Sequence, residues 1–248
     1  MTFIESWFDK QIKTKRGGVL LLLDPDKGTS EELGDLAVKA EEAGASAVLV
    51  GSSLLLGNGF EMAVREIKKR VNIPVFLFPG NGHQVTREAD GILFLSLISG
   101  RNPRWLIEEQ VESAPKIKAI GISTLPTAYI LIESGRVTAV QFMSATVPIP
   151  RNKPDIVLAH AIAAEMMGSK AIFLEAGSGA EKPVPSEVIS VVRSESDLPL
   201  IVGGGIRDFE TAKRILSAGA DFIVVGTQVE ETGDISLIKE IAKITHEL

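Results

Sequence analysis

The chain has 248 residues, of which 45 % are hydrophobic, a formal net charge of −6 and no cysteine. This length and apolar content suit a single barrel-sized domain over residues 1–248, and the lack of cysteine excludes disulfides, thiol nucleophiles and cysteine-bound metals. The acidic balance without a basic block argues against nucleic-acid binding, and no apolar run reaches the roughly 20 residues of a transmembrane helix.

Short apolar runs alternate with amphipathic stretches along the chain. Residues 1–18 come first and lack the apolar centre of a signal peptide, so we expect a soluble, cytoplasmic protein. Eight later runs predict strands, and most are apolar at consecutive positions, as expected of strands buried on both faces. These runs are residues 18–26, 46–53, 73–81, 91–97, 119–123, 170–179, 199–205 and 221–227.

The stretches between these runs have helical periodicity, and several have residues typical of helix ends. They are residues 30–44, 58–70, 103–114, 154–168, 185–195, 208–219 and 233–248. Eight strands that alternate with helices predict an α/β fold of the (β/α)8 TIM-barrel type.

The segment between the fifth and sixth runs departs from this alternation. Residues 128–133 and 137–142 are apolar stretches on either side of Gly135-Arg136, a pattern that predicts a β-hairpin. A polar loop with several prolines follows. We therefore expect a barrel with an extra hairpin between its fifth and sixth strands.

Glycines follow the seventh and eighth predicted strands. Gly203, Gly204 and Gly205 come after the seventh, and Gly226 with Thr227 comes after the eighth. Glycines let backbone N–H groups approach a phosphate closely, and the loops after these two strands commonly hold a phosphate in TIM barrels. The alternative is a pair of tight turns. The coincidence of two such features favours a phosphate site.

Polar residues also follow the first two strands. Asp24 ends the first, and Gly51-Ser52-Ser53 ends the second. A carboxylate at a strand mouth can hold Mg²⁺, which prefers oxygen ligands, and a serine hydroxyl can join the same ion. The alternative for Asp24 is a turn residue, and the alternative for the serines is a capping role.

Glu175 ends the sixth strand, and Gly177, Ser178 and Gly179 follow it. A carboxylate in this place can act as a general base or bind substrate hydroxyls. The glycine-rich stretch can form a second anion nest. The alternative is that Glu175 pairs with a nearby lysine or arginine.

Other polar or aromatic side chains give weaker signals. Tyr129, the only tyrosine, either reaches the site from the hairpin or lies in the core with its hydroxyl at the rim. Trp105 either plugs a groove or packs a helix. The histidines, His83, His160 and His246, lack the spacing of metal ligands, so we do not expect a catalytic zinc site.

Eight strand-end and loop motifs carry a family resemblance. In chain order they are LLDPDK, VLVGSS, FLFPGN, SLISGRNP, PIPRNKPD, FLEAGSGA, LIVGGGIRD and VVGT. This series resembles the geranylgeranylglyceryl phosphate synthases, in particular their archaeal-type second group, from about residue 18 to residue 230. The resemblance implies that geranylgeranyl diphosphate alkylates the 3-hydroxyl of sn-glycerol 1-phosphate and releases diphosphate, a step of archaeal ether-lipid synthesis.

The resemblance also implies the cofactor, the site residues and the assembly. Asp24 and Ser53 match Mg²⁺-binding positions, and Glu175 matches the base or hydroxyl-orienting residue. The positions that match the glycerol phosphate site are Phe173, Leu174, Glu175, Ala176, Gly177, Ser178, Gly179, Gly203, Gly204, Gly226 and Thr227. Many members carry tyrosine in place of Phe173, so Tyr129 or a water would have to supply that hydroxyl here. A homo-oligomer, either a dimer or a hexamer, and transient contact with a membrane surface are further expectations.

Three other interpretations remain open, because a fold does not fix a function. The chain could be another phosphate-binding TIM-barrel enzyme, such as a sugar-phosphate isomerase, aldolase or cyclase. It could bind a flavin phosphate, or it could be a non-catalytic phosphate-binding scaffold. One well-placed carboxylate beside a metal-type aspartate favours prenyl transfer, since isomerases and cyclases need two opposed acid–base groups.

Overall fold

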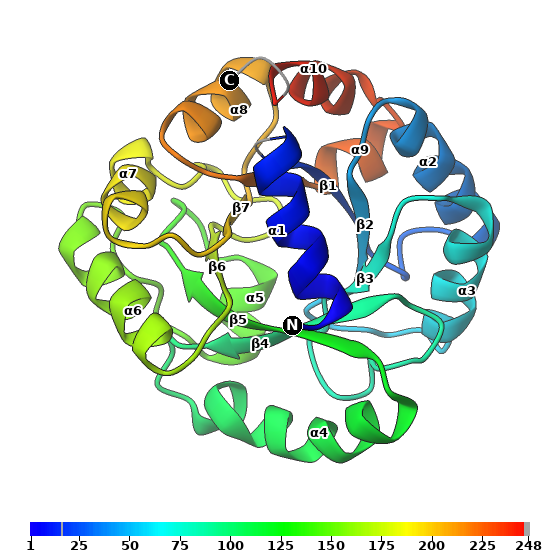
Figure 1. The fold of residues 1–248 in the computed structure, drawn as a ribbon, viewed down its shortest axis with the longest axis horizontal. Helices are drawn as coiled ribbons and strands as arrows, with labels where there is room; N and C mark the ends of the chain where they lie inside the picture. The colour runs from blue at the N-terminus through cyan, green and yellow to red at the C-terminus, as the bar shows by residue number, and fades with distance from the viewer. Residues whose placement is uncertain (16, 246–248) are drawn as a thin grey trace.

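Eight parallel strands close into a barrel, and helices surround it (Figure 1). The computed structural model describes residues 1–15 and 17–245. Each strand pairs with the next one along the chain, and β8 closes the barrel by pairing with β1. The strands are β1 (Gly18–Leu23), β2 (Ala47–Val50), β3 (Val75–Leu77), β4 (Gly91–Leu97), β5 (Ser123–Leu131), β6 (Ala171–Glu175), β7 (Leu200–Gly203) and β8 (Phe222–Val225). The predicted (β/α)8 barrel is confirmed.

The helices begin and end close to most of the predicted boundaries. They are α1 (Phe3–Lys15), α2 (Ser30–Glu42), α3 (Phe60–Arg70), the π-helical turn η1 (Arg104–Glu108), α4 (Glu109–Ile120), α5 (Ala139–Ser144), α6 (Pro154–Met166), α7 (Ser186–Glu195), α8 (Phe209–Ser217), α9 (Thr227–Thr232) and α10 (Ser236–Ile244). Three helices, α1, α5 and α9, are absent from the sequence predictions. Residues 246–248, which end the last predicted helix and include His246, lie outside the described residues. No helix in the described part of the chain is long and apolar enough to cross a membrane.

The predicted hairpin between the fifth and sixth strands is wrong. Residues 128–131 belong to β5, which pairs in parallel with β4 on one side and β6 on the other. The fifth predicted strand, residues 119–123, is also misplaced, because residues 119–120 end α4, Gly121 caps that helix with φ of 71°, and β5 begins only at Ser123. The second predicted hairpin strand is largely helical, because residues 139–144 form α5. Pairing with two distant strands therefore outweighs the local turn signal.

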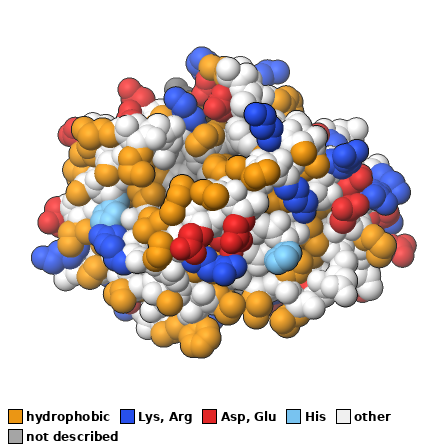
Figure 2. Space-filling model, turned by 90° about the horizontal axis from the view of Figure 1, so that it is seen from below, with side chains coloured by type: hydrophobic (Ala, Val, Ile, Leu, Met, Phe, Trp, Pro, Cys, Tyr) orange, Lys and Arg blue, Asp and Glu red, His pale blue; other side chains and the backbone are white. Residues whose placement is uncertain are grey.

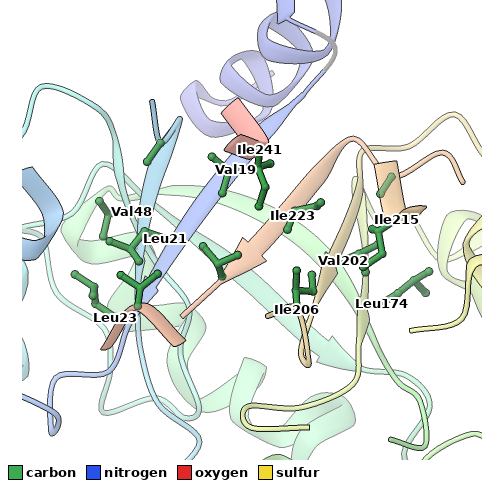
Figure 3. Packing of buried hydrophobic residues seen from close by; sticks show 14 of the residues in the cluster. Val19, Leu21, Leu23, Val48, Leu174, Val202, Ile206, Ile215, Ile223 and Ile241 are labelled. Carbon is green, nitrogen blue, oxygen red and sulfur yellow. The ribbon is translucent and has the colours of Figure 1, made fainter. Parts of the chain in front are cut away.

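Side chains along each strand alternate between two cores. On β1, Val19, Leu21 and Leu23 point outward into the core between strands and helices, as Figure 3 shows. Leu20 points the other way, into the core inside the barrel. This alternation follows from the two-residue period of a strand, and it explains why the runs are apolar at consecutive positions. It also determines which residues at the strand ends face the barrel mouth.

Helix α1 closes the end of the barrel at which the strands begin. In Figure 1 it crosses the front of the barrel, and its Ile4 and Phe8 are fully buried in the inner core. The Phe8 ring lies 4.8 Å from the Phe222 ring and 6.0 Å from the Phe76 ring, centroid to centroid. The carboxyl ends of the strands are therefore left to form a cavity.

Removal of the Phe8 ring should destabilise the fold. Because the ring is fully buried between strands, Phe8→Ala is expected to lower the free energy of unfolding by about 3–5 kcal/mol, measured by urea denaturation. Phe3→Ala on the same helix is the matched control, because Phe3 is 53 % exposed and its loss should change the free energy by about 0.5 kcal/mol or less. Equal effects of the two substitutions would contradict the role of α1 as a plug.

Candidate active site

A cavity of about 660 Å³ opens at the carboxyl ends of the strands. Its wall near the ends of β1, β2, β6, β7 and β8 is polar, and it contains most of the residues that the sequence analysis singled out. Its opposite wall, near β3, β4, η1 and α4, is largely apolar and includes Phe78, Ile92, Phe94, Leu97, Trp105 and Ile117, although Glu109, Gln110 and Ser113 of α4 also line it. The cavity therefore joins a polar half to an apolar half.

Glu175 lies at the centre of the polar wall. It is two residues after Phe173 on β6, so it points inward as Phe173 does. Its side chain is only 5 % exposed, and its Oε1 accepts the backbone N–H of Gly177 at 2.5 Å. Burial raises the pKa of Glu175 to about 7, and hydrogen bonds from Gly177 and the Tyr129 hydroxyl partly oppose this rise. A carboxyl group with this pKa can accept a proton near neutral pH.

Tyr129 reaches Glu175 from β5 itself. It packs in an aromatic group with Phe78 and Phe173, whose stacked rings lie 5.1 Å apart. The Tyr129 ring lies 5.4 Å from the Phe173 ring and 5.9 Å from the Phe78 ring. Burial, reinforced by the Glu175 carboxylate, raises the Tyr129 pKa well above its ordinary value, so this hydroxyl keeps its proton. Phe173 is fully buried beside it and offers no hydroxyl.

The glycines after β7 leave room for the Glu175 carboxyl group. A Cβ atom on Gly203 would lie 3.0 Å from Oε2 of Glu175, and one on Gly204 would lie 2.5 Å from Oε1. Gly204 also has a φ of +87°, which favours glycine. The glycine run is therefore needed by the buried carboxyl group, independently of any phosphate.

Three glycine-containing loops meet beside Glu175. Ser178, after β6, and Thr227, after β8, bring their hydroxyl oxygens within 2.9 Å of each other. Gly179, Gly204 and Gly226 line the same part of the cavity. The structure thus brings together the loops that the sequence analysis assigned to a phosphate.

Several residues predicted to contact substrate lie behind this wall. The side chains of Leu174 and Ala176 point into the outer core, where Figure 3 labels Leu174. Phe173 lies in the inner core. Gly177 and Gly203 are buried beside the carboxyl group of Glu175. Direct contact of these five residues with a substrate stays a prediction.

Asp24 projects into the cavity beyond the end of β1. Its Oδ2 accepts the Ser52 hydroxyl at 2.8 Å, and its Oδ1 accepts the backbone N–H of Asp26 at 3.0 Å. Ser52 is therefore the serine that contacts Asp24, whereas the predicted ligand Ser53 lines the cavity nearby. The role of Ser53 in metal binding stays a prediction.

Oxygen atoms of this kind fit Mg²⁺. A carboxylate and a hydroxyl are hard ligands, and Mg²⁺ commonly binds one or two carboxylates and takes its other ligands from water and phosphate. The described part of the chain contains no group of three or more His, Asp or Glu side chains that could hold a metal ion. An ion at Asp24 would thus depend on water or substrate oxygens.

Lys27 and Glu230 are two residues at the mouth that the sequence patterns did not predict. Glu230 on α9 accepts the Asp24 backbone N–H through Oε1 at 2.6 Å and binds Lys27 Nζ through Oε2 at 2.8 Å. Burial raises the Glu230 pKa, and the hydrogen bond from Lys27 opposes this rise. A signal was present in the sequence, because Glu230 lies one helical turn beyond Gly226-Thr227. Recognising a short helix there would have placed it at the mouth.

Comparisons with known proteins agree with this geometry. The model of a family described as the PcrB family matches residues 10–245. The chain is 45 % identical over 241 residues to the geranylgeranylglyceryl phosphate synthase of Chitinophaga pinensis, a match that covers 97 % of this chain and 94 % of that protein. It is 45 % identical over 226 residues to the synthase of the same name from Korarchaeum cryptofilum, covering 91 % of this chain and 93 % of that protein.

A solved structure is similar over its whole length. The crystal structure of (S)-3-O-geranylgeranylglyceryl phosphate synthase from Thermoplasma acidophilum, in complex with its substrate sn-glycerol-1-phosphate, matches with a TM-score of 0.92. The two sequences are 31 % identical, and the match covers 100 % of both chains.

The buried Glu175 carboxyl group should make stability depend on pH. Its native pKa of about 7 lies above the ordinary value of 4.5. Between these two pH values the native state therefore binds more protons than the unfolded state, so the native state loses stability as the pH rises. Glu175→Gln removes this ionisation. At about pH 8 we expect the free energy of unfolding of the Glu175→Gln variant to exceed that of the wild type by about 1–3 kcal/mol. This difference should shrink as the pH falls toward about 5.

Denaturant titrations at the two pH values measure this difference. Glu181→Gln is the control, because Glu181 is exposed, and it should leave the free energy of unfolding nearly unchanged at both. A Glu175→Gln variant whose stability follows the wild type at every pH would show that the carboxyl group titrates normally.

Proposed function

The chain belongs to the PcrB family and to its geranylgeranylglyceryl phosphate synthases, and we propose that it transfers the prenyl group of geranylgeranyl diphosphate to the 3-hydroxyl of sn-glycerol 1-phosphate. The observation that carries this proposal is the buried carboxyl group of Glu175, which lies between three glycine-containing loops in a cavity whose far wall is apolar. The relative from Thermoplasma acidophilum, bound to sn-glycerol-1-phosphate, supports the choice of acceptor.

The glycerol phosphate is proposed to bind against the polar wall. Ser178 and Thr227 offer hydroxyl donors, and Gly179 and Gly204 let the backbone come close to the phosphate. An acceptor held there has its free hydroxyl groups near Glu175. Firm positioning matters, because a misplacement of about 1 Å can lower the rate by orders of magnitude.

The proposed reaction forms one bond and breaks another. The bond formed joins O3 of glycerol phosphate to C1 of the prenyl group, and the bond broken joins C1 to the departing diphosphate. The hydroxyl proton passes to the carboxylate of Glu175, whose pKa of about 7 suits a base near neutral pH. The protonated Tyr129 hydroxyl helps to hold that carboxylate in place.

The apolar wall is proposed to hold the prenyl tail. It extends from Phe78 past Phe94 and Leu97 to Trp105 and Ile117. Each buried methylene contributes about 0.8 kcal/mol to binding, so a long tail gains much from this wall. Trp105 lines the wall, as the plug interpretation of this residue requires.

Asp24 is proposed to hold Mg²⁺ together with Ser52 or Ser53. The carboxylate and hydroxyl oxygens at this strand end fit such an ion. When bound, Mg²⁺ neutralises charge that develops on the departing diphosphate. Asp24 itself fixes the position of the ion at the polar end of the cavity, opposite the apolar wall.

The proposal has three further parts. The protein acts in archaeal ether-lipid synthesis, it is a cytoplasmic homo-oligomer, and it contacts membranes transiently. Large hydrophobic side chains are exposed on η1, α4 and α5 and at the end of α6, among them Ile107, Val111, Phe142, Met166 and the C-cap residue Met167. Figure 2 views the molecule from the side of α4 and shows hydrophobic side chains spread over this face. Extended apolar surface of this kind is typical of contact with a protein or a membrane.

A turnover assay tests the reaction. Purified protein is incubated with labelled sn-glycerol 1-phosphate, Mg²⁺ and prenyl diphosphates of several lengths, and prenylated glycerol phosphate is expected with geranylgeranyl diphosphate. The value of kcat/KM should rise as the pH approaches 7, because the base must lose its proton. Glu175→Gln should reduce the rate about 10²–10⁴-fold while remaining folded. A failure to form product with any donor would contradict the proposed function.

The metal site has its own test. Asp24→Asn removes the charge but keeps an oxygen, so we expect the Mg²⁺ concentration for half-maximal rate to rise about 10-fold or more. The KM for glycerol phosphate should change little. Asp197→Asn, at an exposed carboxylate outside the cavity, should behave as the wild type. An unchanged Mg²⁺ dependence in Asp24→Asn would rule out Asp24 as the ligand.

A further inference from the structure

Lys27 is fixed beside Asp24 by two sets of contacts. Its backbone N–H donates to the Asp24 carbonyl at 3.0 Å, which closes a turn just after β1. Its ammonium group contacts Glu230 of α9 at 2.8 Å. Glu230 also accepts the backbone N–H of Asp24, so the three residues form one connected unit across β1 and α9.

The unit leaves the ammonium group of Lys27 able to bind a ligand. An ammonium has three donors, and Glu230 is its only side-chain partner among the described residues. The Lys27 side chain is 38 % exposed, whereas that of Glu230 is only 5 % exposed. Both oxygens of Glu230 are engaged, one by Asp24 and the other by Lys27. Glu230 therefore orients the ammonium group of Lys27, a residue that lines the cavity.

The cationic side chains of the cavity are divided between its two ends. Arg136 lies next to Gly179, since its Nη2 is 2.7 Å from the position of a Cβ there. Arg207 donates to the carbonyl of Ala180 at 2.8 Å. Both arginines thus lie near the loop proposed to bind glycerol phosphate. Among the described residues that line the cavity, Lys27 is the cation at the Asp24 end.

The charge at the Asp24 end explains why a cation is needed there. Asp24 and Glu230 are both carboxylates, and they repel a phosphate-bearing ligand. A lysine binds phosphate oxygens as a point charge without demanding a fixed geometry. We propose that Lys27 binds the diphosphate of the prenyl donor directly and that Glu230 is the positioning residue that aims it. This inference rests on the proposed function.

A purely structural role is the competing explanation. The ion pair joins α9 to the end of β1, and its only task would then be to hold the two elements together. The two roles differ in what they predict for the two substrates. If Lys27 binds the diphosphate, its loss weakens only the binding of the prenyl donor and of free diphosphate. If the ion pair only holds α9 in place, its loss also disturbs Thr227 and so weakens the binding of the acceptor.

Three variants separate these roles. Lys27→Met keeps the length and removes the charge, Lys27→Arg keeps the charge, and Glu230→Gln keeps an acceptor for the Asp24 N–H but removes the ion pair. Calorimetry measures the affinity for inorganic diphosphate in the presence of Mg²⁺. Steady-state kinetics measure KM for each substrate, and thermal melting checks the fold. Lys39→Met, on the exposed face of α2, is the matched control.

Lys27→Met is expected to weaken diphosphate binding and to raise KM for the prenyl donor by about 10-fold or more, with KM for glycerol phosphate nearly unchanged. Lys27→Arg should restore most of the loss. Glu230→Gln should give a smaller effect in the same direction, because the ammonium remains but is no longer aimed. Lys39→Met should match the wild type.

Two results would overturn the inference. One is unchanged diphosphate affinity in a folded Lys27→Met variant, and the other is an equal loss of affinity for both substrates. Diphosphate binding does not depend on turnover. A further outcome is that the wild type forms no product while the Lys27→Met variant still binds diphosphate more weakly than the wild type does. That pair of results would contradict the proposed reaction and support the anion site at Lys27.

Discussion

The buried carboxyl group of Glu175 is the constraint around which the site is built. A carboxylate removed from water needs hydrogen-bond donors, and the Gly177 backbone and the Tyr129 hydroxyl meet this need. The same carboxyl group fills the space where Cβ atoms of Gly203 and Gly204 would lie. The glycines after β6 and β7 are therefore linked by one side chain. A phosphate approaching these loops meets a backbone whose shape the carboxyl group already requires.

The alternation of side chains along the strands delivers Glu175 and Asp24 to the same space. Phe173 and Glu175 share the inward face of β6, and the inward positions of β1 continue from Leu20 to Asp24. A shift of one residue in either strand would turn the carboxylate outward toward the helices. Because α1 fills the other end of the barrel with Phe8, the inner core is apolar at one end and polar at the mouth. The fold thus sets both the position of the site and its access.

Local signals predicted the eight-strand barrel and the strand-end residues, because apolar runs and glycines act over a few residues. The failures were non-local. Two segments, residues 128–131 and 139–144, have similar apolar content. The first is a strand because it pairs with β4 and β6, whereas the second has no such pairing and is helical. Helix α9 has only six residues, too few for a clear period, so Glu230 was missed. The choice between Ser52 and Ser53 as the neighbour of Asp24 depends on how the loop turns after β2.

The charges at the mouth must be balanced locally, because the chain itself carries a net charge of −6. Two phosphate-bearing substrates entering the cavity would raise the pKa of Glu175 further, since like charges disfavour ionisation. With a pKa of about 7 already, a further rise would leave the carboxyl group protonated and unable to accept a proton. Cations beside each phosphate oppose this rise. In the proposed reaction, Lys27 at one end of the cavity and Arg136 at the other are the cations placed to neutralise such charge.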